Sequence, residues 1–306
     1  MTMLKERRFT FEGNDGAAIE AYRWSRSDTP KAVVQLAHGM GEHARRYPPA
    51  LDKILEAGFL VYADDHRGHG RTARSAELLG DFGPCGFNGV VDDLAVLTRI
   101  ARKEHPGLPV FFLGHSLGSM LGQAYLLDHS SLVDGAALCG TAAVDQLVRI
   151  IENPKGLGLL NEPFEPARTP FEWLSRDPAQ VDMYIADPLC GFALVPDSMM
   201  SLFAQAARLA DPEQLRRIRR DFPIYIFVGD QDPVNQQTAW VMPLIERYKS
   251  AGLDVTVDIY PGARHEILNE TNRNDVENQL LAWLEKSLEK STGSRSNPAK
   301  PKKQVD

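Results

Sequence analysis

The chain has 306 residues, of which 43% are hydrophobic and 25% are charged, the ordinary balance of a globular protein. Its net charge of −7 argues against a nucleic-acid-binding protein, because such proteins usually carry an excess of basic residues on one face. The three cysteines, Cys85, Cys139 and Cys190, are widely spaced, so neither a disulfide framework nor a zinc site with regular cysteine spacing is expected.

The sequence indicates neither secretion nor a membrane span. The basic start of the chain, MTMLKERRFTFEG, has no apolar run after it, unlike a signal peptide. No stretch approaches the roughly 18 consecutive apolar residues of a membrane-spanning helix. We therefore expect a cytoplasmic protein whose thiols are reduced.

Short apolar segments alternate with helical patterns in the first half of the chain. This alternation is typical of a largely parallel sheet that is covered by helices on both faces. Strands are predicted at Ala18–Trp24, Ala32–Ala37, Phe59–Ala63, Val110–Leu113 and Val133–Cys139, and helices at Tyr47–Ala57, Gly89–Lys103 and Leu117–Leu127.

The alternation stops after Thr141. Residues 142–217 are rich in Pro, Met, Leu and Arg and show no clear strand, which indicates a helical insertion with short helices near Tyr184 and over Asp197–Leu209. We therefore predict a core of residues 1–141 and 218–290, a helical cap at 142–217, and a disordered polar tail at 291–306. Within the second part of the core, strands are predicted at Pro223–Val228 and Val255–Tyr260, and helices at Gln236–Ser250 and Arg273–Lys290.

A serine lies between two glycines in the segment Gly114-His115-Ser116-Leu117-Gly118, after a predicted strand and before a predicted helix. This is the setting of a nucleophile elbow, a sharp turn that projects the serine above the sheet. Active sites of such sheets lie at the carboxyl ends of the strands. On this motif alone, a glycine-rich turn with an incidental serine remains the alternative.

A serine nucleophile needs a base, and in this setting the chain order is serine, acid, histidine. Of the eight histidines, His265 is the one that follows the last predicted strand, in the turn YPGARHEIL. The acid is expected after the preceding strand, in GDQDPV, where Asp232 lies further into the loop and is preferred to Asp230. Three catalytic residue types at three successive strand ends are more specific than any single motif.

An acyl-transfer site also needs two hydrogen-bond donors for the oxyanion. One is expected to be the backbone N–H of Leu117, directly after the serine. The other is expected from the turn HGMGEHARRY, where Gly39 and Gly41 give the backbone freedom to direct an N–H inward. We assign this second donor to Met40.

A cluster of possible metal ligands, Asp64, Asp65, His66 and His69, lies in the turn DDHRGHGRT. The His-x-His-x-Asp-His pattern of metallo-hydrolases is absent, which favours a turn that is held by its own side-chain hydrogen bonds. A Gly-rich phosphate loop followed by Lys and Ser or Thr is also absent. Neither a metal nor an organic cofactor is expected.

Seven segments spread over the chain resemble one family. They are HGMGEHARRY (38–47), DHRGHGRT (65–72, with Thr72 where the family has Ser), ELLGDFGPCGFNGVVDDL (77–94), GHSLGSMLG (114–122), WLSRDPAQVDMYIADPL (173–189), GDQDPV (229–234) and YPGARHEILNE (260–270). The sequence thus resembles the α/β-hydrolase superfamily and, within it, the monoacylglycerol lipase and lysophospholipase group of S33-type, serine-aminopeptidase-like hydrolases. The resemblance implies a mostly parallel eight-stranded sheet flanked by helices, with an inserted helical cap. It also implies Ser116 as nucleophile, Asp232 as acid, His265 as base, and Met40 and Leu117 as oxyanion donors.

The resemblance further implies a serine carboxylic-ester hydrolase that acts on lipid-like monoesters, such as monoacylglycerols or lysophospholipids. The alternatives are a short-chain carboxylesterase, an aminopeptidase or amidase, and an acyltransferase on the same scaffold. Some apolar side chains of the cap are expected to line an acyl-chain tunnel, and an apolar outer face would allow transient contact with membranes or micelles. The apolar side chains of the cap from which the tunnel is expected to draw are Leu157, Leu159, Leu160, Phe164, Phe171, Trp173, Leu174, Met183, Leu194, Met199, Met200, Leu202 and Phe203.

Overall fold

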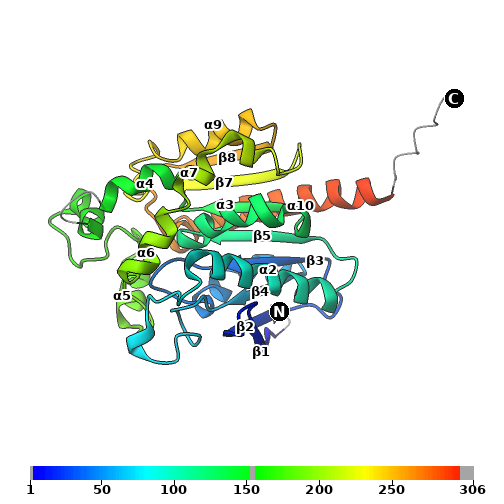
Figure 1. Cartoon of the computed structure of the whole chain (residues 1–306), viewed down its shortest axis with the longest axis horizontal. Coiled ribbons are helices and arrows are strands. Elements are labelled where there is room, and N and C mark those ends of the chain that lie inside the picture. Colours follow the sequence, from blue (N-terminus) through cyan, green and yellow to red (C-terminus); the bar gives the residue numbers. More distant parts are fainter. Residues whose placement is uncertain (1–2, 152–155, 297–306) are drawn as a thin grey trace.

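The computed structural model describes residues 3–151 and 156–296 and is organised around one eight-stranded sheet (Figure 1). The strand order is β1-β2-β4-β3-β5-β6-β7-β8. Strand β2 pairs in antiparallel fashion with β1 and β4, and the strands from β4 to β8 pair in parallel with their neighbours. The strands are β1 (Lys5–Glu12), β2 (Ala18–Ser25), β3 (Ala32–Ala37), β4 (Phe59–Asp64), β5 (Val110–His115), β6 (Gly135–Cys139), β7 (Pro223–Gly229) and β8 (Asp254–Tyr260).

Helices cover both faces of the sheet, as the continuous burial of the inner strands requires. Successive side chains of a strand point to opposite faces, so Phe111 and Phe112 of β5 belong to two different apolar clusters. The cluster of Phe112 includes α2 (Gly86–Glu104), α3 (Leu117–His129) and α9 (Met242–Ser250). The cluster of Phe111 includes α1 (Asp52–Glu56) and α10 (Arg273–Ser296).

Between β6 and β7 the chain forms a series of helices, of which α4, α5 and α6 lie at one end of the molecule (Figure 1). No strand occurs among the described residues of this insertion, as the sequence predicts. The insertion contains α4 (Val144–Ile151), the 3-10 helix η5 (Gly156–Phe164), α5 (Pro178–Ala186), α6 (Pro196–Phe203), α7 (Ala206–Ala210) and α8 (Pro212–Leu215). The remaining 3-10 helices are η1 (Ala44–Arg46), η2 (Pro48–Leu51), η3 (Ala76–Leu78), η4 (Ser130–Leu132) and η6 (Ile267–Asn269).

Strand β1 was not predicted from the sequence, because it is a polar edge strand. Most of its side chains are exposed, so no apolar run marks it. The helix predicted at Tyr47–Ala57 is wrong in its first half. That half is a 3-10 turn over Pro48–Leu51, and the α-helix begins only at Asp52.

Other predicted helix boundaries also differ from the structure. Helix α2 begins at Gly86 rather than Gly89. Helix α9 begins at Met242 rather than Gln236, since residues 236–238 have positive φ angles. Helix α10 continues to Ser296, so the predicted disorder is wrong for residues 291–296, while 297–306 lie outside the described residues. Within the described part of the chain, none of the helices combines the length and apolar character needed to cross a membrane.

The packing of α10 on the sheet predicts a measurable contribution to stability. Leu280 is fully buried in the same cluster as Phe111. Leu280→Ala should lower the free energy of unfolding by about 2–5 kcal/mol, because it leaves a cavity that the rigid sheet cannot fill. Lys286→Ala, at an exposed position of the same helix, should change it by less than about 0.5 kcal/mol. Urea unfolding measures both, and equal effects would contradict the assignment of this helix face.

Candidate active site

Ser116 occupies a strained turn between β5 and α3. Its φ of 52° and ψ of −119° are uncommon for a residue with a side chain and cost of the order of 1–3 kcal/mol. The turn is held because the N–H of Ser116 donates a hydrogen bond of 3.0 Å to the carbonyl oxygen of Cys139 in β6. The predicted elbow is therefore present in the structure.

The two glycines of the elbow allow a close approach of backbones. A Cβ atom at Gly118 would lie 2.0 Å from the carbonyl oxygen of Ala37, at the end of β3. A Cβ atom at Gly114 would lie 2.4 Å from the carbonyl oxygen of Gly118. Any side chain at these two positions would therefore push the start of α3 away from the sheet.

The three residues predicted at successive strand ends lie in hydrogen-bonding contact. Oγ of Ser116 is 2.8 Å from Nε2 of His265, and Nδ1 of His265 is 2.9 Å from Oδ2 of Asp232. The Asp232 carboxylate also accepts hydrogen bonds from the N–H of Val234 at 2.8 Å and from the Asn235 amide at 3.2 Å. Asp232 is fully buried, so these contacts and His265 hold it in one orientation.

Burial is the largest influence on the pKa of His265 and by itself would lower it. The carboxylate of Asp232 and its hydrogen bond act in the opposite direction, and the result is a pKa raised above the ordinary value. The alternative acid, Asp230, faces elsewhere, since its Oδ1 accepts a hydrogen bond of 2.7 Å from the N–H of Gly262. The structure thus brings Asp232, the preferred acid, to the histidine.

Two backbone N–H groups beside Ser116 are available to a ligand. Leu117 is the first residue of α3, so its N–H has no acceptor inside the helix. Met40 follows Gly39, whose own N–H is taken by Glu42 Oε1 at 2.6 Å. No described residue accepts a hydrogen bond from the N–H of Met40 or Leu117, and both residues line the same cavity as Ser116.

A network of the buried side chains of Glu42 and Glu266 with the largely buried Arg46 was not predicted from the sequence. Arg46 donates to Glu42 Oε2 at 2.6 Å and to the two carboxylate oxygens of Glu266 at 2.7 and 2.9 Å. Although burial favours the neutral acid, Arg46 holds the pKa of Glu266 at about 2. The network connects the turn after β3 to the residue next to His265. The spacing of Glu42 and Arg46 is a visible signal for their pairing, but Glu266 lies too far along the chain for any local signal.

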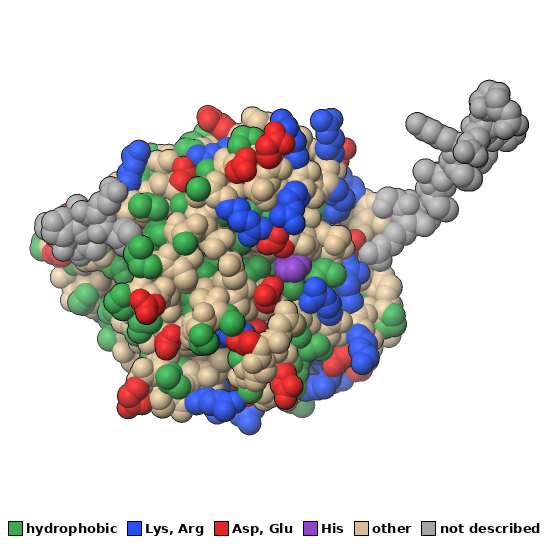
Figure 2. Space-filling model, viewed as in Figure 1, with side chains coloured by type: hydrophobic (Ala, Val, Ile, Leu, Met, Phe, Trp, Pro, Cys, Tyr) green, Lys and Arg blue, Asp and Glu red, His purple; other side chains and the backbone are tan. Residues whose placement is uncertain are grey.

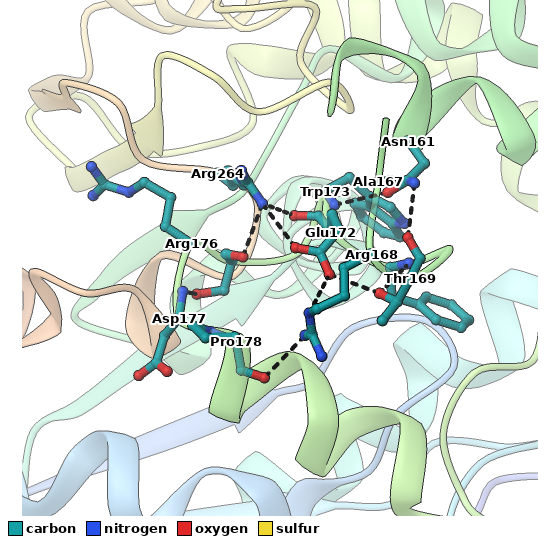
Figure 3. A network of polar contacts seen from close by, with 12 residues as sticks. Asn161, Ala167, Arg168, Thr169, Glu172, Trp173, Arg176, Asp177, Pro178 and Arg264 are labelled. Atoms are coloured by element: carbon teal, nitrogen blue, oxygen red, sulfur yellow. Dashed lines mark hydrogen bonds and ion pairs between the residues drawn. The ribbon is translucent and has the colours of Figure 1, made fainter. Parts of the chain in front are cut away.

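Arg264 connects the helical insertion to the loop that contains His265, called the histidine loop below (Figure 3). This side chain donates hydrogen bonds to the backbone carbonyls of Glu172 and Ser175, the latter at 3.2 Å. The N–H of His265 donates to the carbonyl of Trp173 at 3.3 Å, and the two rings lie 5.1 Å apart. The segment around Trp173 therefore covers the side of His265.

An apolar cavity of about 190 Å³ lies beside Ser116, between the sheet and the insertion. Met183 and Met200, which were predicted as tunnel candidates, are instead 57% and 58% exposed. Leu159, Phe164 and Phe171 are not among the lining residues. The insertion contributes Leu147, Leu157, Leu160, Trp173, Leu174, Tyr184, Leu194, Met199, Leu202 and Phe203 to the lining.

The acidic and histidine side chains of the turn after β4 form a hydrogen-bonded structure, as predicted. Asp64 Oδ2 is 3.0 Å from Nδ1 of His66, and Asp65 accepts a hydrogen bond of 2.9 Å from the Tyr22 hydroxyl. Burial lowers the pKa of His69 to about 3, so this ring is neutral near neutral pH. Within the part of the chain that is described, Asp64, Asp65, His66 and His69 do not form a group with metal-binding geometry.

Known proteins resemble the chain over most of its length. The family model described as serine aminopeptidase, S33, matches residues 28–272. A monoacylglycerol lipase of Mycolicibacterium smegmatis is 31% identical and covers 90% of this chain and 95% of its own length. The human monoglyceride lipase is 28% identical, with 93% and 91% coverage. The crystal structure of a thermostable carboxyl esterase from Bacillus coagulans, in complex with glycerol, has a TM-score of 0.82 at 32% identity, covering 92% of this chain and 99% of the esterase. The predicted α/β-hydrolase fold is thus confirmed, and the chain belongs to the serine aminopeptidase S33 family of hydrolases.

Proposed function

We propose that this protein is a serine hydrolase of lipid-like carboxylic monoesters. Ser116 is the nucleophile, His265 the general base and Asp232 the acid that orients the base. The observation that carries the proposal is the contact of 2.8 Å between Oγ of Ser116 and Nε2 of His265 at the edge of an apolar cavity. The named relatives, monoacylglycerol and monoglyceride lipases, support the same substrate class.

In the proposed mechanism, the contacts among Ser116, His265 and Asp232 serve each proton transfer of ester hydrolysis. His265 removes the proton of Ser116 as Oγ attacks the ester carbonyl, and Asp232 stabilises the imidazolium that forms. The N–H groups of Met40 and Leu117 bind the oxyanion, where one such donor is typically worth about 10²–10³ in rate. His265 then protonates the leaving alcohol. Water, activated by the same histidine, releases the acid from the acyl-enzyme.

The charges around the cavity support an ester rather than an aminopeptidase substrate. An aminopeptidase must neutralise the ammonium group at the start of its substrate. Two carboxylates line the cavity, Glu42 and Glu266, but both already pair with Arg46. The side chains that the insertion contributes to the cavity are apolar or, at Tyr184, hydrogen-bonded to the carbonyl of Gly41. An uncharged acyl chain is the better match.

The helical insertion of residues 142–217 acts in this proposal as the cap that selects the acyl chain. Its outer surface carries the exposed side chains of Met183, Ile185 and Met200. Figure 2 shows hydrophobic side chains gathered over the end of the molecule that α4 to α6 form in Figure 1. Such a surface supports transient contact with the micelles or membranes that hold lipid substrates.

The proposed function is tested first with a graded series of p-nitrophenyl esters, 1-monoacylglycerols and lysophosphatidylcholines. We expect hydrolysis that peaks at medium or long acyl chains. Ser116→Ala should lower kcat by at least about 10⁴-fold while thermal unfolding is unchanged. Ser131→Ala, at an exposed position, is the matched control and should retain activity.

Three results of this series would contradict the proposal. Full activity of Ser116→Ala would exclude this serine as nucleophile. Activity confined to acetyl and butyryl esters would identify a short-chain esterase. Faster cleavage of aminoacyl amides than of any ester would identify an aminopeptidase or amidase.

The raised pKa of His265 predicts the acidic limb of the pH profile. Only the neutral imidazole can accept the proton of Ser116, so kcat/KM should fall as the pH drops through a value above about 6.5, the ordinary histidine pKa. Asp232→Asn removes the carboxylate that raises this pKa. It should move the acidic limb to lower pH and lower kcat by about 10⁴-fold. Asp230→Asn is the matched control, and a loss of that size in this variant instead would reassign the acid.

Two adjacent methionines of α6 lie in different surroundings and distinguish the cavity from the outer surface. Met199 lines the cavity, whereas Met200 is exposed. Met199→Trp should fill part of the cavity and so shift the preference to shorter acyl chains. For a longer chain, kcat/KM should fall by about fourfold for each methylene that no longer fits into the cavity. Met200→Trp should leave the chain-length profile unchanged. Identical profiles for the two variants would show that the acyl chain binds elsewhere.

A further inference from the structure

A second cluster of reactive side chains lies where the insertion meets the turn after β3. His43 comes from that turn, and Asp187 and Cys190 follow α5. One ligand atom from each residue lies within 4.8 Å of the other two. None of the three lines the cavity beside Ser116. The proposed esterase mechanism therefore makes no use of them.

The cluster is held in place by hydrogen bonds. Nε2 of His43 lies 2.9 Å from Oδ2 of Asp187. The other carboxylate oxygen accepts a hydrogen bond of 2.9 Å from the N–H of Leu189, and the N–H of Cys190 donates to the carbonyl of Asp187 at 3.0 Å. The imidazole and the carboxylate thus already converge beside the thiol. Such preorganisation is what partner groups around a metal site provide.

The cluster itself favours a cation, because it contains the carboxylate of Asp187 and no Lys or Arg side chain. His43 is buried, and its polar ring faces Asp187 rather than solvent. The free thiol of Cys190 is partly shielded from solvent beside these two groups.

We propose that His43, Asp187 and Cys190 bind a zinc ion. One nitrogen, one carboxylate oxygen and one sulfur form a ligand set that zinc accepts and that magnesium and calcium, which prefer oxygen, do not. Zinc would bind Nε2 of the neutral His43 ring and the Asp187 carboxylate. It would replace the thiol proton of Cys190, which passes to solvent, and water would complete the tetrahedron.

Zinc at this position would connect the insertion to the core. The insertion already contacts the turn after β3 through two hydrogen bonds to the carbonyl of Gly41, from the Tyr184 hydroxyl at 2.8 Å and from the N–H of Gly191 at 3.0 Å. Gly41 follows Met40, so the cation would help to hold the turn that bears the proposed oxyanion donor. A ligand that binds only the folded chain raises its thermal stability with concentration.

The test uses the full chain with zinc and with cobalt as its spectroscopic substitute. Titration calorimetry should show one zinc ion per chain, and zinc should raise the midpoint of thermal unfolding. Cobalt should produce the near-ultraviolet charge-transfer band of a thiolate ligand. Cys190→Ser should weaken zinc binding by about 100-fold or more and abolish the cobalt band. Cys85→Ser, which changes an exposed cysteine elsewhere, is the matched control and should alter neither.

A second variant separates lost binding from misfolding. Asp187→Asn keeps the size of the side chain and an acceptor for His43, so it should fold normally and still bind zinc at least tenfold more weakly. Zinc affinity unchanged in Cys190→Ser, or a cobalt complex without a thiolate band, would overturn the proposal. Because none of these measurements uses an ester substrate, the proposal stands or fails independently of the proposed hydrolase activity.

Discussion

Helix α3 begins within backbone contact of the carboxyl end of β3, and the geometry above the sheet depends on this close approach. A Cβ at Gly118 would lie only 2.0 Å from the carbonyl oxygen of Ala37, so this contact exists only with glycine. It places the N–H of Leu117 and the turn containing Met40 on the same cavity as Ser116. The positive φ of Ser116 then directs its side chain to His265. The cost of that strained backbone is offset by the packing of β5 and α3 on either side of it.

A second constraint is the guanidinium of Arg46, whose side chain is only 12% exposed. It pairs with Glu42, which holds the N–H of Gly39, and with Glu266, which follows His265. Its guanidinium also lies 4.8 Å from the ring centre of Tyr184 in α5. Because a buried charge must keep its partners, these contacts fix the turn after β3, the histidine loop and the insertion relative to one another.

The sheet and the helical insertion contribute different kinds of groups to the candidate site. The sheet supplies the polar groups, since Ser116, Asp232, His265 and the two N–H groups all follow its strands. The insertion supplies most of the apolar surface of the cavity. Related hydrolases with the same fold include proteins named as lipases and as carboxyl esterases. In the proposed function, the insertion therefore carries most of the contact with the acyl chain.

Much of the fold and of the candidate site could be predicted because their signals are local. The buried strands β3, β5 and β7 are apolar runs, and the glycines around Ser116 mark a turn that few other residues permit. The order of serine, acid and histidine along the chain then indicated Asp232 and His265. The structure brings these side chains into contact, while their catalytic roles stay a prediction for the variants described above.

Pairings between distant segments of the chain were decided only by the tertiary structure. The polar strand β1 is recognised by its pairing with β2 rather than by its composition. The choice of Asp232 over Asp230 depends on which carboxylate reaches His265. Glu266 meets Arg46, and His43 meets Asp187, across 220 and 144 positions of the chain. Local sequence determines backbone conformation and burial, but no local pattern encodes which charged side chains meet when the strands assemble, because those contacts form only in the packed chain.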